Sequence, residues 1–400
     1  MYCVVKSILP VVSKLTFEAA GIFFWINMIN KTFKYRLFPS KSQMVFLDQT
    51  LETCRYWYNN CLAERKDAWE NEKKSVGKFN QLARVKDYRK ENPYAAQVHS
   101  HIMQVVVQDL DKAFQAFFRR VKSGETPGYP RFKGRNRFDS FGLKEYGNGF
   151  KVDGRRLRIT GMGRLRVRWH REMEGEVKTV RILKQAGEWY ACFSCEVEEK
   201  ILPATGKQVG IDVGIHHLLA TSEGDVADNP QWYRSAQSKL RIIQRTVSRR
   251  KMGGSNRRKS VLALQRQHET ISNKRKDFLN NLAFQLTRDY DLIALEKLNI
   301  NGMVRNHHLS KSIMDAGWGY LSKRINDKAA DAGRCVVQVN PAYTSKTCSS
   351  CGTIFENLTL ADRWVECSCG LSIDRDVNAA INILNRAGYA RWDKSTDAQV

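Results

Sequence analysis

In the first half of the chain, alternating apolar and polar residues flank a region with helical spacing. The segment 31–38 alternates and predicts a β-strand, and Ser40, just after it, can cap a following helix. Apolar residues three and four apart predict helix over 41–70, and more helix follows to about residue 122. Residues 142–200 show short alternating runs separated by glycine turns, which predict several strands. This half is therefore expected to be β-rich with a helical insertion.

The second half mixes short buried strands with long helices. From Lys207, the segment KQVGIDVGIHHLLATSEG predicts a strand, a tight turn, a strand and a second turn. Helical spacing then extends from about 233 to 290, and 291–299 predicts a short buried strand that ends at Glu296. Three more predicted elements complete the chain: a helix at about 312–332, a strand at 335–340 and a helix at 376–388. Strands that alternate with helices in this way indicate an α/β protein.

The composition indicates a folded chain with a large positive charge. Its 400 residues suffice for two or three domains, and 42% hydrophobic residues can form a substantial core. The 66 lysines and arginines exceed the 41 aspartates and glutamates, which gives a net charge of +25. A compact body with this charge repels itself unless a polyanion is near, so nucleic acid is the expected partner. An anionic membrane surface is the alternative, but the basic residues are spread along the whole chain.

Four of the ten cysteines cluster near the end of the chain. The cluster consists of Cys348, Cys351, Cys367 and Cys369. Two close thiolate pairs on either side of a short loop predict a structural zinc ribbon and a reduced, cytosolic setting. The second pair is C-x-C, one residue shorter than the usual knuckle, and we expect weakened zinc affinity. Cys192 and Cys195 form another C-x-x-C, but in a predicted strand their side chains point to opposite faces, so no shared metal is expected.

The first 27 residues differ from the rest of the chain. An apolar stretch follows Lys6 and Lys14 and loosely resembles a signal peptide. It lacks a small-residue cleavage site and is too short to span a bilayer, so no membrane association is expected. Met28 opens a well-patterned segment, which suggests that residues 1–27 are upstream sequence read in frame.

Three acidic residues lie at the ends of apolar elements. Asp212 lies within VGIDVG, Glu296 closes LIALE, and Asp376 opens a helix with an apolar face. A carboxylate in a buried strand is costly unless it is paired or holds a metal. Three carboxylates offer hard oxygen ligands for two Mg²⁺ or Mn²⁺ ions, which can act on a phosphodiester. Asp374 is a nearby competitor whose expected role is to cap the last helix. The three acids, on a first strand, a later strand and a C-terminal helix, fit the layout of RNase H-like nucleases, and the cysteine cluster between the second and third acid makes the set specific.

Two segments predict contacts with a nucleic-acid backbone. Residues 127–141 interleave basic and aromatic side chains, which suits backbone contact with base stacking, although an ordinary solvated loop fits equally well. From Lys239 to Lys276, thirteen lysines and arginines face a single glutamate, Glu269, and charge of one sign favours phosphate contact over a solvated helix face. The candidates are Arg131, Lys133 and Arg135 in the first segment, and Arg245, Arg249, Arg250, Lys251, Arg257, Arg258 and Lys259 in the second.

Several segments resemble one family. They include CRYWYNNCLAER, QRTVSRRKMGGSNRRK, LEKLNINGMVRNHHLSKSIMDAGWG, NPAYTSKTCSSCG and CGLSIDRDVNAAINIL. These are similar to segments of TnpB, the insertion-sequence-encoded RNA-guided endonucleases related to type V CRISPR effectors and often catalogued as transposases. The resemblance runs from Met28 to about residue 390. The departures from the family pattern are the leader and the shortened second cysteine pair.

The resemblance implies an α/β multidomain architecture. Residues 28–205 would form a wedge-like β-barrel with an inserted helical recognition lobe at about 40–122. Residues 206–400 would form an RNase H-like (RuvC) nuclease domain, with a zinc ribbon inserted at about 341–372.

The resemblance also implies the site, the cofactors and the partners. The family's three catalytic carboxylates fall on Asp212, Glu296 and Asp376, with Mg²⁺ or Mn²⁺ at the catalytic site and structural Zn²⁺ on the cysteines. The implied partners are a guide RNA from the element's end and a double-stranded DNA target. The implied location is the bacterial or archaeal cytoplasm, at the nucleoid.

Three other functions remain open at this point. A nuclease-impaired RNA-guided DNA-binding protein is disfavoured by the intact set of three acids. An accessory transposase that joins strands ranks lowest, because the sequence shows no separate motif for a catalytic tyrosine. A Holliday-junction resolvase would need neither the zinc ribbon nor the basic first half.

Overall fold

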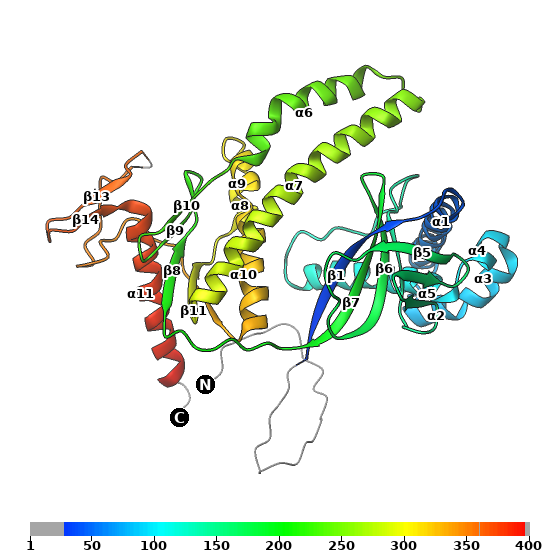
Figure 1. The fold of residues 1–400 in the computed structure, drawn as a ribbon, viewed down its shortest axis with the longest axis horizontal. Coiled ribbons are helices and arrows are strands. Elements are labelled where there is room, and N and C mark those ends of the chain that lie inside the picture. The colour runs from blue at the N-terminus through cyan, green and yellow to red at the C-terminus, as the bar shows by residue number, and fades with distance from the viewer. Residues whose placement is uncertain (1–27, 360, 397–400) are drawn as a thin grey trace, which may run out of the picture. The chain divides into compact units, whose positions relative to one another are not determined.

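The computed structural model describes residues 28–359 and 361–396, so the leader expected at 1–27 lies outside the described part. The described chain divides into two compact units, one ending at Glu198 and the other beginning at Glu199 (Figure 1). Within the described residues, no helix combines the length and the apolar character that a membrane crossing requires.

The N-terminal unit contains a seven-stranded sheet in the order β2-β6-β7-β1-β5-β4-β3. Its strands are β1 (Met28–Phe38), β2 (Ser140–Leu143), β3 (Phe150–Asp153), β4 (Arg156–Ile159), β5 (Gly163–Arg168), β6 (Glu176–Gln185) and β7 (Glu188–Glu198). The long strand β1 pairs antiparallel with both β7 and β5. Among the described strands, β2 and β3 lie at the two edges and do not pair with each other. The structure therefore has an open sheet where the resemblance implied a closed barrel. Burial alternates along β7, with Cys195 buried and Cys192 half-buried, which confirms that they point to opposite faces.

Five helices fill the long connection between β1 and β2. They are α1 (Lys41–Glu72), α2 (Lys78–Ala83), α3 (Val85–Glu91), α4 (Pro93–Gln97) and α5 (Ser100–Lys122). Ser40 caps α1 as predicted, because its hydroxyl accepts from the Gln43 backbone N–H at 3.3 Å while the Gln43 side chain accepts from the Ser40 N–H at 3.0 Å. Apolar side chains of α1 and α5 share one core with the sheet, which includes Trp57, Phe141 and Phe193.

The C-terminal unit is built on a five-stranded sheet in the order β10-β9-β8-β11-β12. The strands are β8 (Gln208–Asp212), β9 (His217–Thr221), β10 (Val226–Asp228), β11 (Leu292–Glu296) and β12 (Cys335–Val339). Strand β11 pairs in parallel with β8 and with β12, whereas β9 pairs antiparallel with β8. The carboxyl ends of β8 and β11 therefore lie at the same edge of the sheet.

Helices cover both faces of this sheet. They are α6 (Trp232–Arg249), α7 (Ser255–Asp289), α8 (Ile300–Met303), α9 (Ser310–Ala316), α10 (Trp318–Ala332) and α11 (Arg375–Thr396). On β11, Ile293 and Leu295 join the core formed with α7 and α10, whereas Leu292 and Ala294 pack with Ile383 of α11 on the opposite face. The sheet thus lies between α11 and the α7/α10 layer (Figure 1).

Glycines interrupt two stretches that the sequence predicted as continuous helix. The predicted helix over 233–290 is two helices that pack on each other, α6 and α7, and Gly253 in the connection has a φ of 79°. The predicted helix over 312–332 is likewise divided at Gly317, where φ is 73°. Both values lie in the left-handed region that glycine adopts without steric cost. The backbone therefore breaks at these glycines, although the spacing of apolar residues continues on both sides.

Candidate active site and metal centre

The structure brings the three predicted carboxylates together from three elements. Asp212 ends β8 and Glu296 ends β11, and the parallel register pairs the preceding residues, Ile211 with Leu295. Asp376 lies in the first turn of α11. Its Oδ2 atom lies 4.0 Å from the position that a Cβ at Gly214 would occupy, two residues beyond Asp212. Residues far apart in the sequence therefore meet at one edge of the sheet.

Electrostatics show that these carboxylates interact. Burial raises the pKa of Asp212 to about 7, and the negative charges of Glu296 and Asp376 contribute to the increase. Burial also raises the pKa of Glu296, although a hydrogen bond from Thr344 and the charge of Arg386 oppose the rise. Negative charge is thus held in a partly desolvated place, where a bound cation would relieve both the repulsion and the desolvation.

A loop after β12 orients Glu296. The buried Thr344 hydroxyl donates a hydrogen bond to the Glu296 carboxylate. The Asn382 side chain of α11 in turn donates to the Thr344 carbonyl oxygen at 2.9 Å. Neither Thr344 nor Asn382 was predicted from its own chemistry. The available signal was the buried asparagine pair, Asn378 and Asn382, on an otherwise apolar helix face.

Asp374 has the capping role that the sequence predicted. Its Oδ1 atom accepts from the backbone N–H groups of Asp376 at 2.8 Å and Val377 at 3.1 Å, which satisfies the first turn of α11. Arg375 Nε lies 3.7 Å from one Asp376 oxygen, and Arg363 Nη1 lies 4.0 Å from the other. Asp376 is thus the buried acid that faces Gly214, and Asp374 fixes the helix end that carries it.

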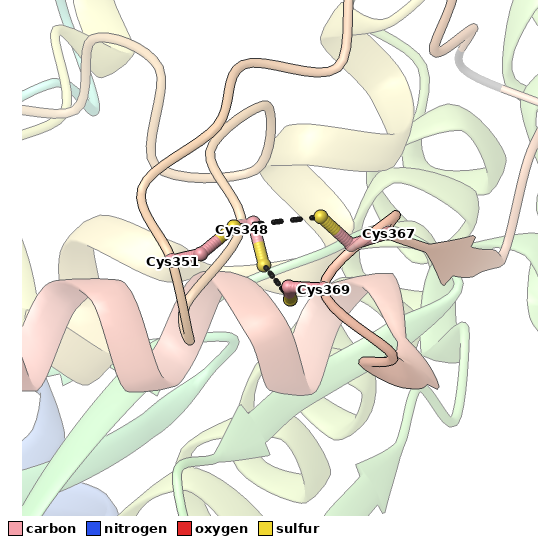
Figure 2. A group of neighbouring side chains, drawn as sticks. All are labelled: Cys348, Cys351, Cys367 and Cys369. Carbon is pink, nitrogen blue, oxygen red and sulfur yellow. Dashed lines mark hydrogen bonds between the residues drawn. The ribbon is translucent and has the colours of Figure 1, made fainter.

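The four clustered cysteines gather around one point (Figure 2). Cys348 and Cys351 lie in the loop after β12, whereas Cys367 and Cys369 lie between β13 (Trp364–Glu366) and β14 (Ser372–Asp374). All four sulfurs lie within 4.8 Å of one another, with 3.7 Å from Cys348 to Cys369 and 3.5 Å from Cys351 to Cys367. Tetrahedral zinc with Zn–S bonds of about 2.3 Å spaces its sulfurs roughly 3.8 Å apart. The quartet could therefore bind a metal such as zinc, and the C-x-C spacing does not keep its sulfurs apart.

Asn378 joins the cysteine loop to α11. Its side-chain oxygen accepts from the Ser349 N–H at 2.9 Å, and its amide donates to the Thr347 carbonyl at 2.8 Å. Asn378 is fully buried and lies two residues after Asp376. The loop that carries Cys348 is therefore fixed to the helix turn that carries the third carboxylate.

The basic candidates of the C-terminal unit are on the α6/α7 pair. Arg245 and Arg249 line one face of α6 together with Arg241, around a hollow of about 410 Å³. Arg250 and Lys251 follow in the connection, and Arg257, Arg258 and Lys259 lie near the start of α7. All are exposed except the half-buried Arg257, and no ion pair is recorded for them among the described residues. Their charge is thus available to an anionic partner.

The basic candidates of the N-terminal unit lie on a loop that is attached to α1. Asn59 accepts from the Lys133 backbone N–H at 2.8 Å and donates to its carbonyl at 3.0 Å. The Lys133 ammonium lies 5.7 Å from the centre of the Tyr58 ring, a cation–π distance. Arg131 and Arg135 are exposed. The loop therefore presents two exposed guanidinium groups from a fixed backbone.

The fold and the site define a two-unit α/β protein with a carboxylate cluster and a four-cysteine centre, and sequence comparisons identify its family. Residues 192–307 match the OrfB family of IS605, described as "Probable transposase", and residues 318–383 match the Cas12f1-like TNB domain. Residues 28–74 match the family's "Helix-turn-helix domain", although here they form strand β1 and the single long helix α1.

Two curated relatives cover most of the chain. A protein of Streptomyces pristinaespiralis named "Putative RNA-guided DNA endonuclease" is 34% identical over 91% of each chain. InsQ of Escherichia coli strain K12, with the same descriptive name, is 28% identical over 90% of this chain and 92% of its own. The chain belongs to this TnpB family. Its fold is similar to a solved Cas12f1–sgRNA–target DNA complex, with a TM-score of 0.58 and 13% identity over 90% of this chain and 99% of that chain.

Proposed function

We propose that the protein is an RNA-guided DNA endonuclease with an RNase H-like (RuvC-type) catalytic core. The observation that carries the proposal is the meeting of Asp212, Glu296 and Asp376 at one edge of the C-terminal sheet. Family membership supports RNA guidance, because the relatives that align along nearly the whole chain are named for it. In this proposal residues 28–205 are a wedge with a helical recognition lobe, and 206–400 are the nuclease unit with its ribbon at about 341–372.

The carboxylate cluster fits a pair of Mg²⁺ or Mn²⁺ ions. Asp212 and Glu296 at the ends of β8 and β11, with Asp376 in the first turn of α11, offer carboxylate oxygens for two ions about 3.5–4 Å apart. When bound, they would supply Lewis-acid activation of water and stabilise the leaving oxygen of the phosphodiester.

The chain's own residues position these ligands. The Thr344 hydroxyl donates to one oxygen of the Glu296 carboxylate. Because this bond fixes the orientation of the carboxylate, it also fixes the direction of the second oxygen. Asp374 caps the turn that carries Asp376, and Asn378 ties that turn to the cysteine loop. We propose that zinc on the four cysteines stabilises this loop and, through Asn378, the position of Asp376.

The exposed basic residues would bind the guide RNA and the DNA. The basic candidates of α6 and the start of α7, and the loop of Arg131 and Arg135, offer exposed positive charge on both units. Such charge suits a polyanionic partner, in keeping with the net charge of +25. Phosphate contacts of this kind position a nucleic acid, whereas base pairing with a guide would supply sequence specificity. The corresponding location is the cytoplasm, at the nucleoid.

The test begins with the RNA that copurifies with the full chain. Sequencing that RNA and programming its guide segment should direct cleavage of a matched DNA duplex in Mg²⁺. Asp212→Ala, Glu296→Ala and Asp376→Ala should each reduce cleavage by several orders of magnitude while binding remains. Asp228→Ala is the matched control, because this exposed acid ends β10 of the same sheet. Guided binding without cleavage by the unaltered chain would support the nuclease-impaired alternative, and absence of any bound RNA would contradict the proposal.

A further inference from the structure

Tyr343 combines an exposed aromatic ring with an unusual backbone conformation. Its φ is 63°, in the left-handed region that a bulky residue rarely adopts. Its side chain is 62% exposed, and no contact of its ring or hydroxyl is recorded among the described residues. Burial of the ring therefore does not explain why a tyrosine, and not a glycine or asparagine, occupies this position.

Hydrogen bonds hold this backbone in place on both sides of Tyr343. Asn340 accepts from the Ala342 N–H at 2.9 Å, and Arg386 of α11 donates to the Asn340 and Ala342 carbonyls at 2.8 and 2.7 Å. The Tyr343 carbonyl accepts from the Thr347 hydroxyl at 2.7 Å. A strained residue persists where its surroundings over-determine it, and such positions cluster at functional sites.

The turn holds Tyr343 one residue from the carboxylate site. Thr344, the following residue, is buried and donates to Glu296. Adjacent Cα atoms are about 3.8 Å apart, so the Tyr343 backbone lies one residue from a direct contact with the proposed metal ligand. Lys346 on the same loop and Lys297, directly after Glu296, are both exposed. An exposed aromatic ring with exposed cations on neighbouring segments is a combination that binds a base and its phosphate.

We propose that Tyr343 stacks on a nucleobase of the DNA strand that is cut, and so positions the scissile phosphate beside Glu296. This inference rests on the proposed function, because it assigns a substrate contact in that same site. A ring fixed by a rigid turn loses little freedom when a base stacks on it, which makes stacking at this position effective. Tyr343 is thus a positioning residue that acts on the DNA, while Thr344 acts on the ligand.

Three substitutions separate the ring, the hydroxyl and the backbone. Tyr343→Phe keeps the ring and should cleave at close to the normal rate. Tyr343→Ala removes the ring, and Tyr343→Gly removes both the ring and the backbone strain. Both should cleave about 5- to 150-fold more slowly, the equivalent of one stacked base. Tyr343→Gly should keep or raise the melting temperature, so a slow but stable Gly variant supports stacking. A Gly variant that cleaves normally would overturn the proposal.

A modified substrate provides the second arm. An abasic site is moved one nucleotide at a time through the cut region of the guide-matched DNA. The unaltered protein should cleave more slowly when the abasic site lies at one particular position. Tyr343→Ala should cleave that substrate no more slowly than it cleaves the intact DNA. Equal slowing of both proteins at every position would overturn the inference.

A binding measurement keeps this test separate from the fate of the proposed function. A single-stranded oligonucleotide with 2-aminopurine should be quenched by the unaltered protein and by Tyr343→Phe, and less by Tyr343→Ala. This quenching is expected even if the protein cleaves no DNA. Absence of cleavage would overturn the proposed function but not the stacking assignment. Equal quenching by all three proteins would overturn the stacking assignment.

Discussion

Gly210 allows α11 to lie against β8, and adding one methyl group there should displace the third carboxylate. A Cβ at Gly210 would lie 2.0 Å from the Ala380 carbonyl oxygen. It would also lie 2.8 Å from the Leu384 backbone nitrogen and 2.9 Å from the Leu384 Cβ. The conflicting atoms belong mainly to the backbone of α11, so no side-chain rotation relieves the clash. The substitution Gly210→Ala therefore requires the helix to move.

The size of the effect follows from these distances. Non-bonded atoms at rest lie about 3.5–4.0 Å apart, so α11 must withdraw by more than roughly 1 Å. Asp376 lies four residues before Ala380, about one helical turn away, and moves with the helix. A misplacement of about 1 Å at a catalytic group can cost roughly 100-fold in rate. Overpacking of a core typically costs about 1–3 kcal/mol in the free energy of unfolding.

The assay compares Gly210→Ala in β8 with a control glycine-to-alanine substitution in α11. Gly388 lies in α11, and a Cβ there would meet no atom within 4 Å. Gly388→Ala should leave cleavage unchanged and raise stability by up to about 1 kcal/mol, because alanine favours helix over glycine. Gly210→Ala should lower the melting temperature by roughly 2–12 °C and cleavage by about 100-fold. Normal cleavage and an unchanged melting temperature in Gly210→Ala would refute the account of how Asp376 is positioned.

Three further results are expected. In EDTA, Asp212→Asn should raise the free energy of unfolding by roughly 2–4 kcal/mol at pH 8. The gain should grow from pH 4 to 7, where the native carboxyl with its pKa of about 7 keeps a proton that the unfolded chain releases; a gain constant with pH would contradict this. Cys348→Ser should reduce bound zinc and ease chelation, whereas Cys192→Ser should retain zinc; elemental analysis decides between them. Replacing Arg245 and Arg249 by glutamine should reduce the slope of log affinity against log salt by about 1.4–1.8, and an unchanged slope would remove α6 from the interface.

The strongest local patterns were sufficient to predict the elements that carry the site. Apolar runs that end in Asp212 and Glu296 predicted β8 and β11, because a short buried strand needs apolar side chains on both faces. The cysteine spacing predicted a four-sulfur centre, because two close pairs bring thiolates near each other in almost any compact loop. The capping roles of Ser40 and Asp374 were also predicted, since a cap depends on neighbours within three residues.

Other features were outside the reach of local patterns. The helical period continued across 250–254 and across Gly317, so the breaks that create α6, α7, α9 and α10 were not predicted. The lower zinc affinity expected of the C-x-C pair stays a prediction. The position of its two sulfurs within 4.8 Å of the other pair depends on the β13–β14 hairpin, which local spacing alone does not show. The open edges of the N-terminal sheet likewise depend on strand pairing across long sequence separations.

The sequence by itself determined which residues carry charge, sulfur and apolar surface, and at which ends of which elements they lie. Only the tertiary structure decided that Asp212, Glu296 and Asp376 come together, that Thr344 orients Glu296, and that Tyr343, the residue before Thr344, is exposed. The physical reason is that burial and backbone preference are local properties of a segment. The meeting of these side chains instead depends on the parallel register of β8 with β11 and on the close approach of α11 that Gly210 permits.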